Sequence, residues 1–231
     1  MRKSKLLSIC NLNAAYGQIV ALAGIDLEIS DGEIVCLLGR NGMGKSTTVK
    51  CICGLLKPSD GKILFKGQNI VGLPSFKVAR MGIGLVPEGR RVFTSLTVKE
   101  NLMGSARPGY WNLEHVTKLF PIFGERLNQQ ASTLSGGEQQ MLSIGRALMT
   151  NPSLIILDEA TEGLSPIVSD RVWKVLKRIK HEGISILLID KLIPKLTEIA
   201  DTGFIIEKGK TVWYGQMNKL TNSVARKYLS V

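Results

Sequence analysis

The chain has few histidines, few cysteines and no long apolar run, and each shortage excludes a class of protein. His115 and His181 accompany four cysteines whose spacing fits no metal-binding motif, so a zinc site is not expected. The longest apolar runs, at 153–157 and 185–189, are far shorter than the roughly 18 to 20 residues that a membrane helix needs. No repeat or low-complexity tract occurs. The sequence therefore predicts an ordinary globular protein that does not span a bilayer.

The cysteines indicate a reducing compartment. Cys36 lies in a strand-like run, while Cys51 and Cys53 occupy an expected helix, so we expect buried free thiols. The N-terminal residues are basic, but three polar residues interrupt their apolar portion, which makes a poor signal peptide. A cytoplasmic chain is the expectation.

Acidic residues are scarce beside basic ones, with 19 Asp and Glu against 30 Lys and Arg and a net charge of +11. Such an excess raises the question of nucleic acid or acidic lipid. The excess is diffuse, however, and its densest part, residues 171–180, has apolar residues at the spacing of a helix with one buried face. A solvated basic helix face explains it, so no nucleic-acid partner is expected, whereas attraction to anionic lipid headgroups stays open.

Short apolar runs separated by turns predict strands in about the first sixty residues and further strands at 82–86, 153–159 and 184–190. Hairpins are expected over 57–68 and over 203–215, the second turning at Lys208 and Gly209. A helix is expected from Ser46 to Cys53. These elements predict an α/β layer.

A helical segment interrupts that layer from about residue 87 to 150. Thr97 with Glu100 and Ser135 with Glu138 fit the capping-box pattern of a helix start. Residues 107–112 are expected to form a surface excursion. After the interruption, another helix is expected to open at the N-cap and N1 pair of residues 165 and 166 and to end near residue 183.

A phosphate-binding loop follows an apolar strand. Gly39, Gly44, Lys45 and Ser46 match G-x-x-x-x-G-K-[ST], with a strand expected before and a helix after. Glycines let backbone amides close around phosphate oxygens, Lys45 supplies a point charge near the β- and γ-phosphates, and the Ser46 hydroxyl can ligate Mg²⁺. A glycine turn into a helix would explain neither Lys45 nor Ser46.

An acidic pair, Asp158 and Glu159, ends an expected buried strand at the edge where such sheets bind ligands. Asp158 can hold the metal, and Glu159 can orient a water for in-line attack on the γ-phosphorus. An exposed turn is the plain alternative, but the phosphate loop makes the pair specific.

Residues 134–140, "LSGGEQQ", form a second candidate anion site. Ser135, Gly136 and Gly137 stand at an expected helix start, where free amides and the helix dipole attract an anion. The order of phosphate loop, helical insertion, "LSGGE" and acidic strand resembles the ATP-binding subunit of ABC transporters over essentially the whole chain.

The resemblance implies an ABC-type P-loop NTPase core with an N-terminal antiparallel β subdomain and an inserted helical subdomain. It implies one domain over 1–231, with the ATP-binding core and β subdomain in about 1–86 and 151–231 and the helical subdomain in about 87–150. Two subunits would meet head to tail around two ATP molecules, each γ-phosphate held by one subunit's phosphate loop and the other's Ser135 helix.

Site residues follow from the same resemblance. Tyr16 matches the aromatic residue that stacks on adenine. Glu88 stands where most relatives have glutamine, and Lys191 where they usually have histidine; lysine reaches phosphate but lacks the proton shuttling of imidazole. Ser165 and Ala160 replace a common aspartate and a common proline. The expected catalytic residues are Glu159, Lys45 and Lys191; the expected metal ligands for Mg²⁺ are Ser46, Glu88 and Asp158. The residues expected to hold ATP are Tyr16, Gly39, Arg40, Asn41, Gly42, Met43, Gly44, Lys45, Ser46, Thr47, Glu88, Ser135, Gly136, Gly137 and Asp158.

Three stretches, "VPEGRRVFTSLTVKENL", "TLSGGEQQMLSIGRALM" and "EGLSP", are similar to one subgroup, the second ATPase subunit of branched-chain amino-acid importers. That implies ATP hydrolysis at the inner membrane face, with a homodimer or a sister ATPase, two transmembrane permease subunits and, indirectly, a periplasmic binding protein. An importer of urea or short amides, or a soluble or regulatory ABC ATPase with weak hydrolysis, is the alternative. The departures at 88, 165 and 191 suggest a weakened nucleotide site.

Overall fold

Two β-sheets organise residues 4–229, the part of the chain that the computed structural model describes. The larger sheet has the order β10-β9-β3-β8-β7-β6, with β10 antiparallel to β9 and the other neighbours parallel. Strands β3, β7 and β8 are buried along their whole length, as expected for parallel strands covered on both faces. The strands are β3 (Ile34–Leu38), β6 (Ile83–Val86), β7 (Leu154–Asp158), β8 (Ser185–Ile189), β9 (Thr202–Glu207) and β10 (Lys210–Gln216).

The smaller sheet is antiparallel and has the order β2-β1-β4-β5. In β2, Ile25, Leu27 and Ile29 are buried while Asp26 and Glu28 are exposed, so one face of the strand packs on the core. This face joins the cluster that includes β3 and the helix after it. The strands are β1 (Lys5–Tyr16), β2 (Ile19–Ser30), β4 (Asp60–Phe65) and β5 (Gln68–Asn69).

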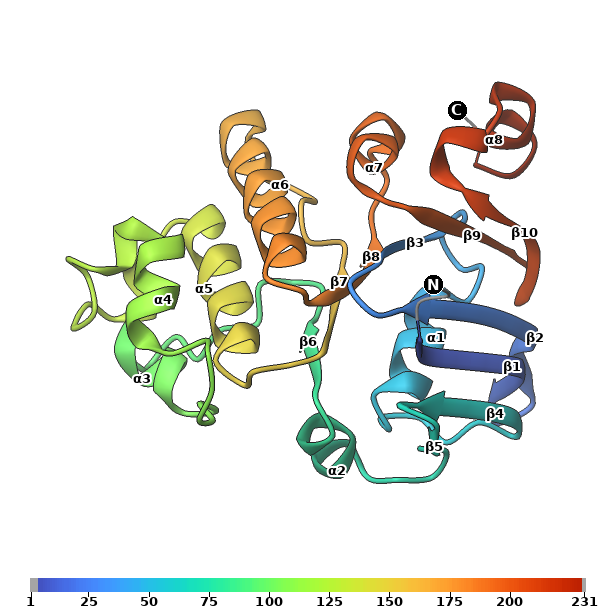
Figure 1. The fold of residues 1–231 in the computed structure, drawn as a ribbon, viewed down its shortest axis with the longest axis horizontal. Helices are drawn as coiled ribbons and strands as arrows, with labels where there is room; N and C mark the ends of the chain where they lie inside the picture. The colour runs from blue at the N-terminus through green and yellow to red at the C-terminus, as the bar shows by residue number, and fades with distance from the viewer. Residues whose placement is uncertain (1–3, 230–231) are drawn as a thin grey trace.

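A helical unit lies at the opposite end of the molecule from the antiparallel sheet (Figure 1). Its core joins that of the parallel sheet through residues such as Leu102, Phe120 and Leu142. This arrangement confirms the predicted fold class. The helices of this unit are α3 (Val98–Met103), α4 (Leu113–Leu119), η1 (Pro121–Phe123), η2 (Ala131–Thr133) and α5 (Gly136–Leu148). The other helices are α1 (Lys45–Ile52), α2 (Ser75–Arg80), α6 (Pro166–His181), α7 (Ile193–Ile199), η3 (Met217–Lys219) and α8 (Asn222–Leu229).

The predicted helix caps form with one exception. Both capping boxes are present, at Thr97 for α3 and at Ser135 for α5. Ser165 occupies the N-cap position of α6, but its hydroxyl accepts no capping hydrogen bond from residues 4–229. Pro166 at N1 lacks an N–H and has a φ suited to the helix, so it contributes to this start without the hydroxyl.

One sequence-based prediction needs correction. The segment 107–112 is not simply a surface excursion, because Trp111 is only 5% exposed and packs in the main core. Asn151 holds this segment in place: its side chain donates to the carbonyls of Arg107 and Trp111 and accepts from the amide of Trp111. Cys10 is exposed, whereas the other three cysteines are buried as expected.

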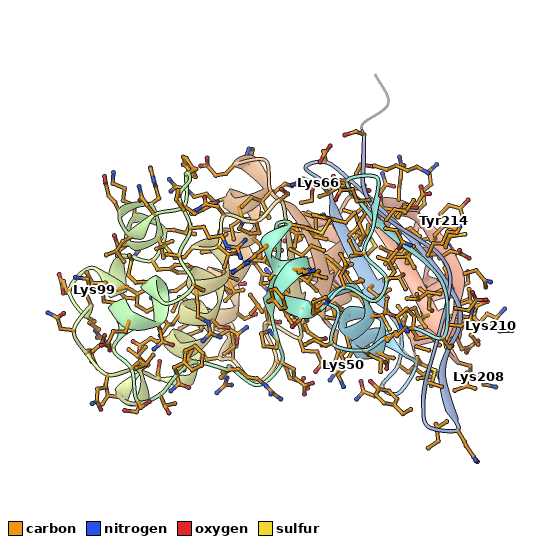
Figure 2. All side chains as sticks on the ribbon, turned by 90° about the horizontal axis from the view of Figure 1, so that it is seen from below. Lys50, Lys66, Lys99, Lys208, Lys210 and Tyr214 are labelled. Carbon is orange, nitrogen blue, oxygen red and sulfur yellow. The ribbon has the colours of Figure 1, made fainter. Side chains whose placement is uncertain are left out.

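The positive charge is spread over the surface. The labelled lysines lie along the length of the molecule, with Lys99 on the helical unit at one end and Lys208 and Lys210 on the hairpin at the other (Figure 2). Helix α6 buries Val172 and Leu176 and leaves its basic residues mostly outside, as predicted. Within residues 4–229, no helix combines the length and the apolar character needed to cross a membrane.

Candidate functional site

The loop between β3 and α1 is built around backbone conformations that favour glycine. Gly39 has a φ of 147°, and a Cβ there would lie 2.5 Å from the carbonyl oxygen of Ile206 in β9. Lys45, the first residue of α1, folds back over the loop and donates to the carbonyls of Gly39 at 2.8 Å and Arg40 at 3.0 Å. Burial lowers the pKa of the Lys45 ammonium. The loop thus holds one buried cation against two of its own backbone carbonyls.

A cleft of about 390 Å³ lies beside this loop. It brings together most of the phosphate loop with the acidic residues and Lys191. Its lining residues are Ala21, Asn41, Gly42, Gly44, Lys45, Ser46, Thr47, Glu88, Glu159, Glu162 and Lys191.

Some predicted nucleotide ligands lie outside this cleft lining. Arg40 donates to the carbonyl of Lys227 in α8 at 3.5 Å, and Met43 accepts from the Lys208 amide through sulfur at 3.2 Å. Tyr16 is 42% exposed and its hydroxyl accepts from Lys50 of α1 at 3.3 Å. Its ring is therefore available beside the phosphate-loop helix without being part of the cleft.

Asp158 is the last residue of β7 and is 7% exposed. Burial raises the pKa of its carboxyl, although a hydrogen bond with Ser46 acts in the opposite direction. Its Oδ1 atom is buried and has no hydrogen-bond partner among residues 4–229. An orphaned carboxylate oxygen beside a serine hydroxyl suits a hard cation such as Mg²⁺ or a water held by it.

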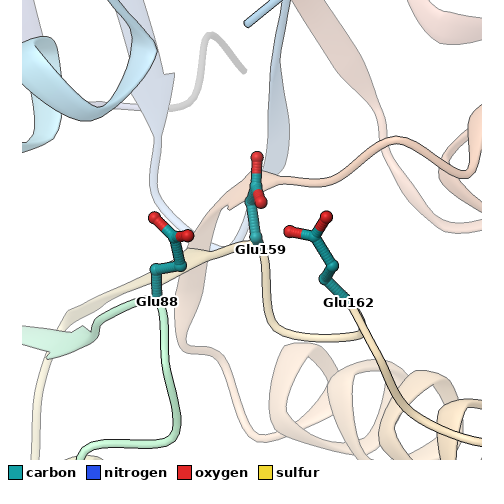
Figure 3. Close-up of side chains that lie close together, drawn as sticks. All are labelled: Glu88, Glu159 and Glu162. Atoms are coloured by element: carbon teal, nitrogen blue, oxygen red, sulfur yellow. The ribbon is translucent and has the colours of Figure 1, made fainter.

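Glu159 turns the chain directly after β7. It adopts a φ of 52°, and its amide donates to the carbonyl of Ile189 at the end of β8 at 2.8 Å. One carboxylate oxygen each of Glu88, Glu159 and Glu162 lie within 4.8 Å of one another (Figure 3). A hydrogen bond with Glu162, together with burial, raises the pKa of Glu159 to about 7. Glu159 is thus able to hold or release a proton near neutral pH.

Lys191 connects the two carboxylates on this side of the cleft. Its ammonium donates to Glu162 at 2.8 Å and to Glu159 at 3.4 Å. The hydrogen bond with Glu162 raises the pKa of Lys191, so the lysine stays charged. Asp190, just before it, accepts from the amides of Lys191 and Leu192 and fixes the backbone.

The second predicted anion site lies elsewhere. Ser135 precedes α5, and its hydroxyl and the Glu138 side chain form the reciprocal cap. Neither Ser135 nor the two glycines after it line the phosphate-loop cleft. The structure therefore separates the two predicted anion sites of one chain.

Two residues of the site were not predicted from the sequence. Glu162 lines the cleft and binds Lys191, and the signal for it is a third carboxylate in the turn after Asp158 and Glu159. Arg90 donates to the carbonyl of Gly163 at 2.7 Å, and no local sequence pattern indicates that contact.

Comparison with known proteins shows which family and which relatives the chain resembles. The family model described as "ABC transporter" matches residues 11–162. The chain is 41% identical over 217 residues to the high-affinity branched-chain amino acid transport ATP-binding protein BraG of Pseudomonas aeruginosa, covering 90% of this chain and 92% of that protein. It is 32% identical to the lipopolysaccharide export system ATP-binding protein LptB of Haemophilus influenzae, with 97% of each chain covered.

The fold is shared with solved ATP-binding cassettes. A nucleotide-free cassette from an ABC transporter superposes with a TM-score of 0.82 at 26% identity, covering 99% of this chain and 96% of that one.

Proposed function

Because this chain belongs to the ABC transporter family, we propose that it is the ATP-hydrolysing subunit of an importer for branched-chain or other hydrophobic amino acids. The observation that carries the proposal is the meeting of Lys45 and Glu159 in one cleft. Beside Ser46, one oxygen of Asp158 has no hydrogen-bond partner within residues 4–229. A buried cation, a candidate metal ligand and a candidate base are the parts that phosphoryl transfer to water needs.

Each group has a role in this proposal. The amides of the phosphate loop and Lys45 would hold the β- and γ-phosphates of ATP. Ser46, Asp158 and Glu88 would hold Mg²⁺, which neutralises charge on the phosphates when bound. Glu159 would accept a proton from a water molecule. The oxygen of that water would attack the γ-phosphorus in line as the bond from the γ-phosphorus to the ADP oxygen breaks.

A second chain completes the site in this proposal. The start of α5 presents free amides and about half a positive charge, yet it does not line its own chain's cleft. Ser135, Gly136 and Gly137 would therefore bind the γ-phosphate held by a neighbouring chain, which is another copy or a sister ATPase. Hydrolysis would remove that shared phosphate and open the pair.

A permease docking surface is supported by exposed apolar residues, one of which lines a groove. Leu55, Phe76 and Phe93 are each more than half exposed. A groove of about 190 Å³ includes Leu55 with residues of α2, β6 and α5. Exposed apolar groups around a groove mark a protein interface. We propose that two permease subunits dock here, with the chain on the cytoplasmic membrane face and a periplasmic binding protein reached only through them.

The assignment of the transported substrate depends on the relatives alone, because no residue of this chain would contact that substrate. The 41% identity to BraG favours amino acids. The 32% identity to LptB, an ATP-binding protein of lipopolysaccharide export, leaves a different transported substrate as an alternative. The replacement of histidine by Lys191 favours a second candidate function, a regulatory ATPase with weak hydrolysis beside a more active sister subunit.

The test is hydrolysis of Mg-ATP by the purified chain with and without its sister ATPase and permeases. Lys45→Ala is expected to abolish nucleotide binding, whereas Glu159→Gln is expected to bind ATP and accumulate a closed pair. If Glu159→Gln stays monomeric at saturating ATP with the sister ATPase present, the shared-site mechanism is wrong. If the wild-type complex hydrolyses ATP only through the sister subunit, the regulatory function replaces the catalytic one.

A further inference from the structure

Arg90 links two loops and a helix that are distant in sequence. Its guanidinium donates through Nη2 to the carbonyl of Gly163 at 2.7 Å, in the loop that follows Glu159. The other nitrogen of the same fork, Nη1, lies against Gly136, the first residue of α5. One side chain thus joins the segment after β6, the loop after β7 and the start of the Ser135 helix.

The guanidinium of Arg90 occupies the space that a side chain at Gly136 would fill. A Cβ on Gly136 would lie 2.0 Å from Arg90 Nη1 and 2.8 Å from its Cζ atom. An alanine there would push the guanidinium away, since the end of an arginine side chain is flexible and the helix backbone is not. The absence of a side chain at Gly136 therefore creates the space that Arg90 fills.

The backbone around Arg90 is also unusual. Arg90 has a φ of 52°, a conformation that is uncommon for residues other than glycine, and Gly89 before it has a φ of 86°. Two left-handed residues in succession turn the chain so that the guanidinium faces the two loops. Such conformations persist where surrounding contacts hold them, and they cluster at functional positions.

The charge of Arg90 has no partner in the described chain. Within residues 4–229, Arg90 makes no ion pair, and its guanidinium lies beside the positive end of α5. A cation at a helix N-terminus is unfavourable, so the arginine is held there by the Gly163 carbonyl against the helix dipole. An anion arriving at α5 would meet this extra charge.

We propose that Arg90 is a positioning residue that fixes the Glu159–Ser165 loop against the Ser135 helix and sets the anion site ready for a neighbour's γ-phosphate. This inference rests on the proposed function, because it assigns Arg90 to the shared nucleotide site. As a further consequence, the segment that carries Glu88 and leads to the exposed Phe93 is joined through Arg90 to the Glu159–Ser165 loop and to the start of the Ser135 helix. Movement at the permease-facing surface would then reach the anion site through one side chain.

The first test needs no nucleotide and no second chain. Hydrogen–deuterium exchange is measured on peptides covering 160–166 and 135–139 in the full chain. Arg90→Ala is expected to speed exchange in peptide 160–166 about tenfold, the effect of losing the hydrogen bond from a charged donor to the Gly163 carbonyl. Peptide 135–139 loses only the packing contact with Gly136, so its exchange should change less. Arg90→Lys is expected not to restore protection, since one ammonium cannot span both contacts. Arg91→Ala is the matched control. Arg91 is an exposed neighbour, and its backbone carbonyl, which accepts a hydrogen bond from Arg146, stays in place when the side chain is removed.

Gly136→Ala supplies a reciprocal test. It is expected to loosen peptide 160–166, although Gly136 lies in another element, and to have no further effect on that peptide in an Arg90→Ala background. Unchanged exchange in Arg90→Ala, or independent effects of the two substitutions on peptide 160–166, would overturn the proposal.

The second test separates this inference from the proposed function. In a Glu159→Gln background with the sister ATPase present, Arg90→Ala is expected to raise the ATP concentration needed for association about tenfold, with unchanged ATP binding to the single chain. Association that is unaffected by Arg90→Ala would overturn the role assigned to Arg90. Failure of the Glu159→Gln parent to associate would instead contradict the shared site, and the exchange experiment would still decide whether Arg90 holds the two loops.

Discussion

The ammonium of Lys191 donates to the carboxylate of Glu162 at 2.8 Å, closer than its 3.4 Å approach to Glu159. The lysine is therefore held mainly by a residue of the loop and only secondarily by the candidate base. This relationship explains how a lysine can lie just after β8 and contact Glu159 only secondarily. It also makes Glu162 part of the site, because removing it would release Lys191.

Replacing Lys191 by histidine is expected to raise ATP turnover in the assembled complex roughly tenfold. Imidazole can transfer a proton and hold a fixed geometry, whereas the ammonium of Lys191 stays charged and is tied to Glu162. The measurement is phosphate release at saturating Mg-ATP. Lys195→His is the matched control, because Lys195 pairs with Asp170 at 3.2 Å on α6. Equal turnover of Lys191→His and wild type would show that the lysine does not weaken the site.

The pH dependence of hydrolysis is expected to report Glu159. Its pKa is raised to about 7, so the base is protonated below neutral pH and turnover should fall as the pH drops through about 7. Glu162→Gln removes the carboxylate that raises this pKa, and the acidic limb should move to lower pH. Asp170→Asn, an exposed carboxylate change on α6, should leave the limb in place. A limb that does not move in Glu162→Gln would exclude this coupling.

Much of the fold could be predicted because its signals are local. The Lys208–Gly209 turn and the two capping boxes depend on a few neighbouring residues, and each forms as predicted. Trp111 was mispredicted because its burial depends on Asn151, forty residues later in the chain. Pro, Gly and aromatic residues in sequence indicate a loop, but they do not indicate what that loop packs against.

The site was predictable to the extent that its chemistry follows a contiguous motif. Gly44 to Ser46 and the pair after β7 lie in such motifs, and the structure brings Lys45 and Glu159 to one cleft. Arg90 could not be found in this way, because its contacts join three separated segments. The absence of hydrogen bonds to Asp158 Oδ1 from residues 4–229 likewise emerges only once the whole sheet is folded.

Asn151→Ala is expected to destabilise the chain by roughly 2–4 kcal/mol, because it removes three hydrogen bonds that hold residues 107–112. Urea unfolding measures the loss. Asn151 has a φ of 50°, so Asn151→Gly removes the same hydrogen bonds without a strained alanine and should cost less. A loss below about 1 kcal/mol in both variants would mean that Trp111 packs without this anchor.

Gly39 and Gly42 of the phosphate loop differ in their surroundings, so alanine substitutions at these two positions form a matched pair. Gly39→Ala is expected to cost roughly 2–4 kcal/mol and to weaken ATP binding, since its Cβ would overlap the Ile206 carbonyl at 2.5 Å. At Gly42, no atom of residues 4–229 lies within 4 Å of an added Cβ, so Gly42→Ala should cost only about 1–2 kcal/mol from backbone strain. Unfolding and ATP titration of both variants test this. Equal costs would mean that the contact with β9 relaxes.

Asp158→Asn is expected to stabilise the nucleotide-free chain while removing its response to Mg²⁺. Burial raises the pKa of the Asp158 carboxyl, which means that its charge is unfavourable in the folded state without a cation. Because the pKa of Asp158 is higher in the folded state than in the unfolded state, the free energy of unfolding falls as the pH rises from the unfolded-state pKa through the folded-state pKa. The neutral amide of Asp158→Asn does not ionise and removes this loss. At pH 8 the melting temperature of Asp158→Asn should therefore lie above that of the wild type, by roughly 2–4 °C for each kcal/mol gained in the free energy of unfolding. The wild type should gain further stability from Mg-ATP over ATP with EDTA, and Asp158→Asn should not. A variant that keeps the full Mg²⁺ effect would move the metal to Glu88 and the neighbouring carboxylates.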